Sequence, residues 1–381
     1  MADQVVRLDV DDFEDTMAMM ARAFSEWGPH DFPRMYPALY RPTAEVMQRH
    51  FAVRRDGHVV AAVGVMPLRL QVGDVALPTA GIGGVATDPE CRGEGLMTQV
   101  MEEAVLAIRR EGYALSYLGG HRQRYGRFGW EVAGTDIKMQ FDARNVASVD
   151  AEGIRIVPLS EEGDDVVAAK KLHDARIVHC HRSAGDFRSM LCNWEQRPHA
   201  AYDASNRLVG YLSADKAGAK VNELVGADAE TAGRILAAWV RQQQGFVTLW
   251  VDRYDTALAR RLGQFAQYTT TDGSGNWQIF DWPRTVGPLW QVRCREASLP
   301  EGSLVLGVEG LRANLRLTVD GDRGLCETTD ASPDLSADAA TMIRVLFGPA
   351  EPSLVLPITG PAQLLHAWCP LPLALPGPDR V

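Results

Sequence analysis

The sequence predicts an α/β (α+β) protein in which one folding unit occurs twice and a third, smaller domain follows. Strand-like and helix-like segments alternate over residues 5–135, and residues 206–255 repeat the order strand, hairpin, strand, helix and strand. From about Phe280 the pattern changes to several strands, one helix and a Pro-rich tail. At 381 residues the chain is long enough for two or three cores. The predicted domains are 1–142, 143–282 and 283–381.

The first unit opens with a strand at "VVRLD" and a helix that starts near Asp11 or Asp12. "HFAVRRDGHVVAAVGVMPLRLQVGD" predicts a hairpin that turns at Asp56-Gly57. A strand over "VALPTAGIGGVATDP", a helix and a strand at "YALSYLGG" come next, which indicates one parallel crossover.

The second copy departs from the first at one turn. Where the first unit has "TDPECRGEGL", the second has "GADAETAGRIL", with carboxylates in place of the Arg-Gly-x-Gly turn. In the third domain, "EGSLVLGVEGLRANLRLTVDGDRGLCETTD" predicts strands and "LSADAATMIRVLFG" a helix. The tail "PLPLALPGPDRV" cannot be helical because of its prolines.

Composition narrows the class of protein. The six cysteines form no CxxC pair, so we expect neither a disulfide framework nor a thiolate metal site, and no metal. The formal net charge of −10 disfavours nucleic acid and anionic membranes as partners, and it leaves room for a cationic small molecule. No apolar run is long enough to span a bilayer and no leader follows Met1, so we expect a cytoplasmic protein without a membrane partner.

The turn "TDPECRGEGL" has the features of an anion site. It lies between a strand and a helix, so unpaired backbone N–H groups gather at the helix N-terminus, where the helix dipole favours negative charge. Gly93 and Gly95 allow close approach of a phosphate, and Arg92 adds a cation. The alternative is a tight turn in which the glycines only supply positive φ and Arg92 is solvated.

"VATDPECRGEGLMTQVMEEAV" and the later "YGRFGWE" resemble the acetyl-coenzyme A (acetyl-CoA) site of the GNAT acyltransferases. The resemblance implies that backbone amides of an R/Q-x-x-G-x-G/A turn bind the pyrophosphate and that a tyrosine lies near the thioester sulfur. Met97 stands where the family has a small residue. The expected contacts with acetyl-CoA, including strand amides that pair with the pantetheine arm, come from Val85, Ala86, Thr87, Arg92, Gly93, Glu94, Gly95, Leu96 and Met97.

The layout of the whole chain is similar to the Eis (enhanced intracellular survival) family. This resemblance implies tandem GNAT folds, the second degenerate and without the pyrophosphate loop, followed by a sterol-carrier-protein-like domain. Members of that family acetylate amines, some of them aminoglycosides, and are associated with hexamers. We therefore expect an N-acetyltransferase that acts on a cationic amine and forms a homo-oligomer, as a hexamer if the family pattern holds.

Each part of acetyl transfer has a candidate residue. Tyr125 is the expected general acid, because a phenol of pKa about 10 can protonate a thiolate whose conjugate acid has a pKa of about 8.5. The resemblance implies that the C-terminal carboxylate, here of Val381, is the base, although family members often end in an aromatic residue; a disordered tail is the alternative. Glu26, Trp27 and Asp31 are candidates for an acceptor pocket, with a solvated loop as the alternative.

Other functions stay open at this point. The acceptor of a GNAT enzyme can also be a protein lysine or a polyamine. From another class, the chain could be a binding or scaffold protein that holds an apolar ligand in its third domain and has lost catalysis.

Overall fold

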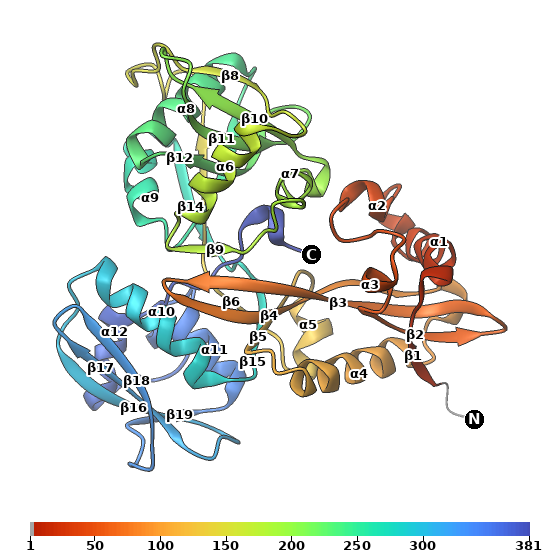
Figure 1. Cartoon of the computed structure of the whole chain (residues 1–381). Helices are drawn as coiled ribbons and strands as arrows, with labels where there is room; N and C mark the ends of the chain where they lie inside the picture. Colours follow the sequence, from red (N-terminus) through yellow and green to blue (C-terminus); the bar gives the residue numbers. More distant parts are fainter. Residues whose placement is uncertain (1–3) are drawn as a thin grey trace.

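The computed structural model describes residues 4–381, apart from the side chain of Trp27, and its strands form three sheets within that range (Figure 1). The first sheet has the order β1-β2-β3-β4-β5-β15-β6, and β9 pairs with the end of β3. Its strands are β1 (Val5–Arg7), β2 (His50–Arg55), β3 (His58–Val72), β4 (Val75–Thr87), β5 (Leu115–Leu118), β6 (Glu131–Ala133), β9 (Val178–Cys180) and β15 (Gly275–Ile279).

Helices cover both faces of the first sheet. Successive residues of β2 point to opposite faces, so Ala52 packs in the cluster that contains α1 (Phe13–Phe24), α2 (Phe32–Met35) and α3 (Ala44–Met47). Its neighbours Phe51 and Val53 pack in the cluster that contains α4 (Leu96–Arg110). The hairpin at Asp56-Gly57 is confirmed, with φ values of 50° and 84° that suit a type I′ turn.

The second sheet has the order β14-β7-β13-β12-β11-β10-β8, and it includes the predicted strand-hairpin-strand-helix-strand order. Its strands and helices are β7 (Asp136–Phe141), β8 (Arg155–Pro158), β10 (Arg197–Tyr202), β11 (Leu208–Ala214), β12 (Lys220–Gly226), β13 (Val247–Asp252), β14 (Tyr268–Asp272), α6 (Asp164–Asp174), α7 (Phe187–Met190), α8 (Ala229–Gln242) and α9 (Thr256–Gly263).

The two larger sheets exchange strands. β7 lies before residue 142 in the chain but belongs to the second sheet, while β15 lies before residue 282 and belongs to the first. β15 is inserted between β5 and β6, where it pairs antiparallel with both. The two units are therefore joined by shared sheets as well as by the chain between them.

The third unit has the sheet order β18-β17-β16-β19. Its elements are α10 (Trp282–Glu296), β16 (Gly302–Val308), β17 (Asn314–Asp320), β18 (Arg323–Thr329), β19 (Leu335–Ala337), α11 (Ala339–Phe347) and α12 (Leu365–Trp368). One apolar cluster contains side chains from this sheet, from α10 and α11, and from residues 371–375 of the tail.

The Pro-rich tail is buried inside the protein. Leu371 N–H donates to the Leu346 carbonyl at 2.7 Å, and Thr135 N–H donates to the Leu373 carbonyl at 3.0 Å. Beyond the short turn η8 (Gly377–Asp379), the chain ends between α7 of the second unit and α2 of the first (Figure 1). Across residues 4–381 the helices are too short or too polar to cross a bilayer.

Candidate active site

Two parallel strands of the first sheet separate at the candidate site. β4 pairs with β5 from Thr79, opposite Leu115, to Ile82, opposite Leu118. β4 then continues to Thr87 along β3, with a bulge at which Gly84 takes φ 58°. The stretch of β4 beyond Ile82 is thus turned away from β5.

The turn that follows β4 has the expected backbone geometry. Gly93 and Gly95 have φ values of 88° and 81°, a left-handed conformation that glycine adopts without the steric cost of a Cβ atom. A Cβ atom placed on either glycine would have no atom within 4 Å, so both face open space. Gly95 caps α4 without a side-chain hydrogen bond, which leaves the N–H groups of the first helical turn available to an anion.

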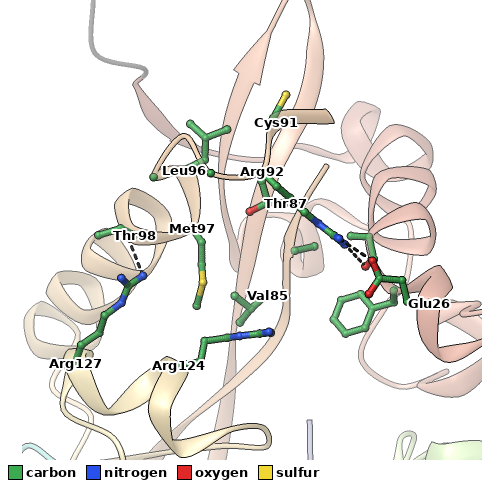
Figure 2. Close-up of a pocket in the computed structure, with 15 residues that line it drawn as sticks. Glu26, Val85, Thr87, Cys91, Arg92, Leu96, Met97, Thr98, Arg124 and Arg127 are labelled. Atoms are coloured by element: carbon green, nitrogen blue, oxygen red, sulfur yellow. Dashed lines mark hydrogen bonds and ion pairs between the residues drawn. The ribbon is translucent and has the colours of Figure 1, made fainter. Parts of the chain in front are cut away.

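A cavity of about 490 Å³ lies in front of this turn (Figure 2). Eight of the nine residues expected to contact the cofactor line it: Val85, Ala86, Thr87, Arg92, Gly93, Gly95, Leu96 and Met97. Glu94 is the exception, because its carboxylate lies 2.5 Å from the Arg55 guanidinium. A cavity formed by a strand, a glycine turn and a helix N-terminus fits an extended ligand that carries phosphates.

Three arginines give the cavity positive charge. Arg92 Nη1 lies 2.8 Å from Glu26 Oε1, and its Nη2 donates to the Ala23 carbonyl at 2.9 Å. Arg124 and Arg127 enter from the opposite side, and Figure 2 shows the Arg124 side chain extending toward Val85. Neither arginine was predicted as a site residue from the sequence, although "RQRYGRF" places both within two residues of Tyr125.

Tyr125 lies at the end of α5 (Arg122–Tyr125), beside the cavity rather than among the residues that line it. Its ring is buried with Leu96 and Trp130 and lies close to Gly120, where a Cβ atom would be 2.8 Å from a ring carbon. Burial raises the pKa of the Tyr125 phenol, and the adjacent Arg124 guanidinium lowers it to a smaller extent. The phenol therefore carries its proton at neutral pH.

The C-terminus lies on the first sheet where β4 and β5 part. A Cβ atom on Gly81 would be 2.7 Å from a Val381 methyl group, and one on Gly83 would be 3.6 Å from the Val381 carboxyl carbon. Directly after β5, a Cβ atom on Gly119 would be 4.0 Å from the Val381 oxygen. The glycines of β4 thus make room for the last residue, and the structure brings the terminal carboxylate to the first unit.

Of the three acceptor candidates, the two whose side chains the structure describes, Glu26 and Asp31, lie in different surroundings. Glu26 lies in the arginine-rich cavity, paired with Arg92. Asp31 is exposed and caps α2 by accepting a hydrogen bond of 3.1 Å from Arg34 N–H. Trp27 belongs to the turn η2 (Ser25–Trp27), and its side chain lies outside the described part of the structure.

The corresponding turn of the second unit has the opposite charge. Asp228 caps α8 by accepting a hydrogen bond of 2.7 Å from Thr231 N–H, so a carboxylate of the chain itself occupies the helix N-terminus. Asp255 lines the same cavity, which has a volume of about 210 Å³. The Asp228 carboxylate disfavours a phosphate at this helix N-terminus, although Arg176 also lines the cavity. In residues 4–381, no group of three or more His, Cys, Asp or Glu side chains is arranged to hold a metal.

Comparison with known proteins agrees with this geometry. Residues 4–133 match the family model described as "Acetyltransferase (GNAT) domain". This part of the chain is a GNAT acetyltransferase domain, and the protein is an acyltransferase. GNAT enzymes use acetyl-CoA, which the glycine turn and its cavity fit.

Solved structures resemble the whole chain in fold. A GCN5-related N-acetyltransferase from Kribbella flavida is 18% identical with a TM-score of 0.66, covering 96% of this chain and 95% of that one. A probable N-acyltransferase from Enterococcus faecalis V583 is 16% identical with a TM-score of 0.69, covering 98% of both chains. Eis1 from Mycobacterium abscessus is 14% identical with a TM-score of 0.66, covering 97% of this chain and 99% of that one. No curated protein matches the chain.

Proposed function

We propose that this protein is an Eis-like N-acetyltransferase that transfers the acetyl group of acetyl-CoA to a primary amine by direct attack. The observation that carries the proposal is the turn at Gly93 and Gly95, which opens α4 toward a cavity lined by arginines. The likeness of the whole chain to Eis1 supports the finer assignment. In this assignment the second unit is a degenerate GNAT fold and the third is sterol-carrier-protein-like.

Different residues around the cavity carry out the binding and proton-transfer steps of the reaction. The N–H groups at the start of α4 and the arginines bind the phosphates of acetyl-CoA, and backbone amides from Val85 to Thr87 pair with its pantetheine arm. The Val381 carboxylate accepts the proton that the attacking amine loses as its nitrogen bonds to the acetyl carbon. When the carbon–sulfur bond breaks, the Tyr125 phenol donates its proton to the departing thiolate.

The proposed acceptor is a small cationic amine, with aminoglycosides as the first candidates and polyamines or protein lysines as alternatives. Trp194 supports an acceptor site beside Val381, because it packs on Tyr36 with ring centroids 4.9 Å apart and donates from Nε1 to the Arg380 carbonyl at 3.2 Å. It is 41% exposed, so one face is available to a ligand. A homo-oligomer, as a hexamer, belongs to the same proposal.

The reaction is tested by free-thiol release from acetyl-CoA with a panel of aminoglycosides, polyamines and lysine peptides. Release that depends on one class of amine supports the proposal and identifies the acceptor class. Binding of an apolar ligand by a chain that does not bind acetyl-CoA would favour the scaffold function instead.

Tyr125→Phe is expected to lower kcat about 100-fold, because general acid catalysis contributes about 10²–10⁴-fold and the substitution removes only the proton donor. The Kd of acetyl-CoA should stay the same. The matched control is Tyr113→Phe, which removes the hydroxyl of another tyrosine that packs against the same apolar cluster. Steady-state kinetics and calorimetry separate the two effects, and an equal loss of affinity would count against the acid role.

One molecule of acetyl-CoA is expected to bind per chain. The second unit has Asp228 where the first has its glycine turn, so only the first unit can accept the pyrophosphate. Isothermal titration calorimetry of the full chain should give a stoichiometry of one. A value of two would show that the second unit keeps a cofactor site.

A further inference from the structure

Arg182 forms a fully buried ion cluster between the second unit and the tail. Its guanidinium donates to both oxygens of Asp379 at 3.0 and 2.7 Å and to both oxygens of Glu223, on β12, at 2.8 and 2.7 Å. Arg176 adds a second cation, 3.7 Å from Glu223. Buried charges are retained in folded proteins when they are paired in this way, and breaking one pair leaves its partner without compensation.

Two further contacts hold the same few residues of the tail. Asn193, in the turn η5 (Asn193–Glu195), donates from Nδ2 to the Pro378 carbonyl at 2.8 Å. The Arg380 guanidinium lies 2.5 Å from Asp136 on β7, a strand of the second sheet. With Arg182 and the Trp194 contact described above, residues 378–380 are each bonded to the second unit or its sheet.

The position of the terminal carboxylate follows from these contacts. Val381 is only two residues beyond Asp379, and each residue spans at most about 3.6 Å, so an anchor at Asp379 confines the carboxylate to a short tether. On the first unit, Gly81 and Gly83 provide a surface without side chains that receives Val381. The direction and the reach of the tail are thus set by the second unit.

We infer that the second unit is a clamp for the C-terminus, in which Arg182 is the positioning residue that places the Val381 carboxylate in the first unit's active site. The inference rests on the proposed function for its catalytic consequence. It gives the unit that has lost the cofactor turn a role in the reaction, which Arg182 performs through the tail and without touching either substrate.

The test uses the full-length chain with Asp379→Asn, which removes the charge that binds the tail while Arg182 keeps Glu223 as its partner. The first measurement is release of Val381 by carboxypeptidase Y, followed by intact mass. We expect release about tenfold faster or more than in the wild type, because the residues before Val381 are freed. We also expect kcat to fall about 10- to 100-fold, since a misplacement near 1 Å costs about 10²-fold, with the Kd of acetyl-CoA unchanged.

Arg182→Lys is the conservative variant: an ammonium keeps the charge balance but cannot bond both carboxylates as a fork, so both effects should be intermediate. Asp228→Ala is the matched control, because it loosens the second unit at the cap of α8 without touching the tail. It should leave kcat and the release of Val381 at wild-type values.

Release of Val381 from Asp379→Asn at the wild-type rate overturns the clamp, whatever the activity. Faster release with an unchanged kcat supports the clamp and overturns the base assigned to Val381 in the proposed function. The proteolysis assay does not depend on acetyl transfer. It therefore tests the clamp even if none of the amines is acetylated.

Discussion

Gly95→Val is expected to abolish acetyl-CoA binding while the protein stays folded. Gly95 has φ 81°, a conformation that costs an ordinary L-residue about 1–2 kcal/mol and disfavours a β-branched one further. The added side chain would also project into the space at the start of α4 that the pyrophosphate is proposed to occupy. We expect the Kd of acetyl-CoA to rise at least about 100-fold, which corresponds to about 2.8 kcal/mol.

The matched control for this substitution lies at the other end of the same helix. Gly112 follows α4, has φ 74° and also has no atom within 4 Å of an added Cβ. Gly112→Val should therefore carry a similar backbone strain and bind acetyl-CoA as the wild type does. Calorimetric titration with acetyl-CoA measures the affinity of both variants. If Gly95→Val and Gly112→Val bind acetyl-CoA with similar affinity, the turn is not the anion site.

Deletion of residues 379–381 is expected to lower kcat about 100-fold or more, the lower end of what a general base contributes, without unfolding the protein. The truncated chain keeps the buried tail up to Pro378 and the Arg182–Glu223 pair. Asp136 loses Arg380 as its partner, and burial already raises the pKa of Asp136 to about 6. We expect some loss of thermal stability, with acetyl-CoA affinity unchanged because the cavity is intact.

A chain extended by one glycine after Val381 complements the deletion. It keeps all residues of the tail and moves the carboxylate by about 3.8 Å, the spacing of consecutive Cα atoms. Its kcat should fall as that of the truncated chain does, while its stability stays near that of the wild type. Full turnover by either variant would remove the terminal carboxylate from the mechanism.

The local parts of the site could be predicted from the sequence because their signals are local. The glycines at 93 and 95 between a strand and a helix determine the turn, and eight of the nine expected residues line one cavity. The position of the Glu94 side chain could not be predicted in this way, because its partner Arg55 is 39 residues away in the chain.

The nonlocal parts could not be predicted in the same way. The exchange of β7 and β15 between the sheets depends on pairings between strands far apart in the chain, for which the sequence holds no local signal. The place of the tail followed only from a family resemblance. The sequence does contain Gly81 and Gly83 within a strand. Their role can be recognised only when the structure shows Val381 packed against them.

In the proposed mechanism, the chain's own terminal carboxylate completes the active site of the first unit. The most direct measurement is kcat of the full-length protein prepared by ligation with either a C-terminal carboxamide or the native acid at Val381. The two proteins differ in one group and keep the same side chains, so we expect kcat of the amide to be lower by about 100-fold or more, with acetyl-CoA affinity unchanged. Equal turnover of the acid and the amide would contradict it.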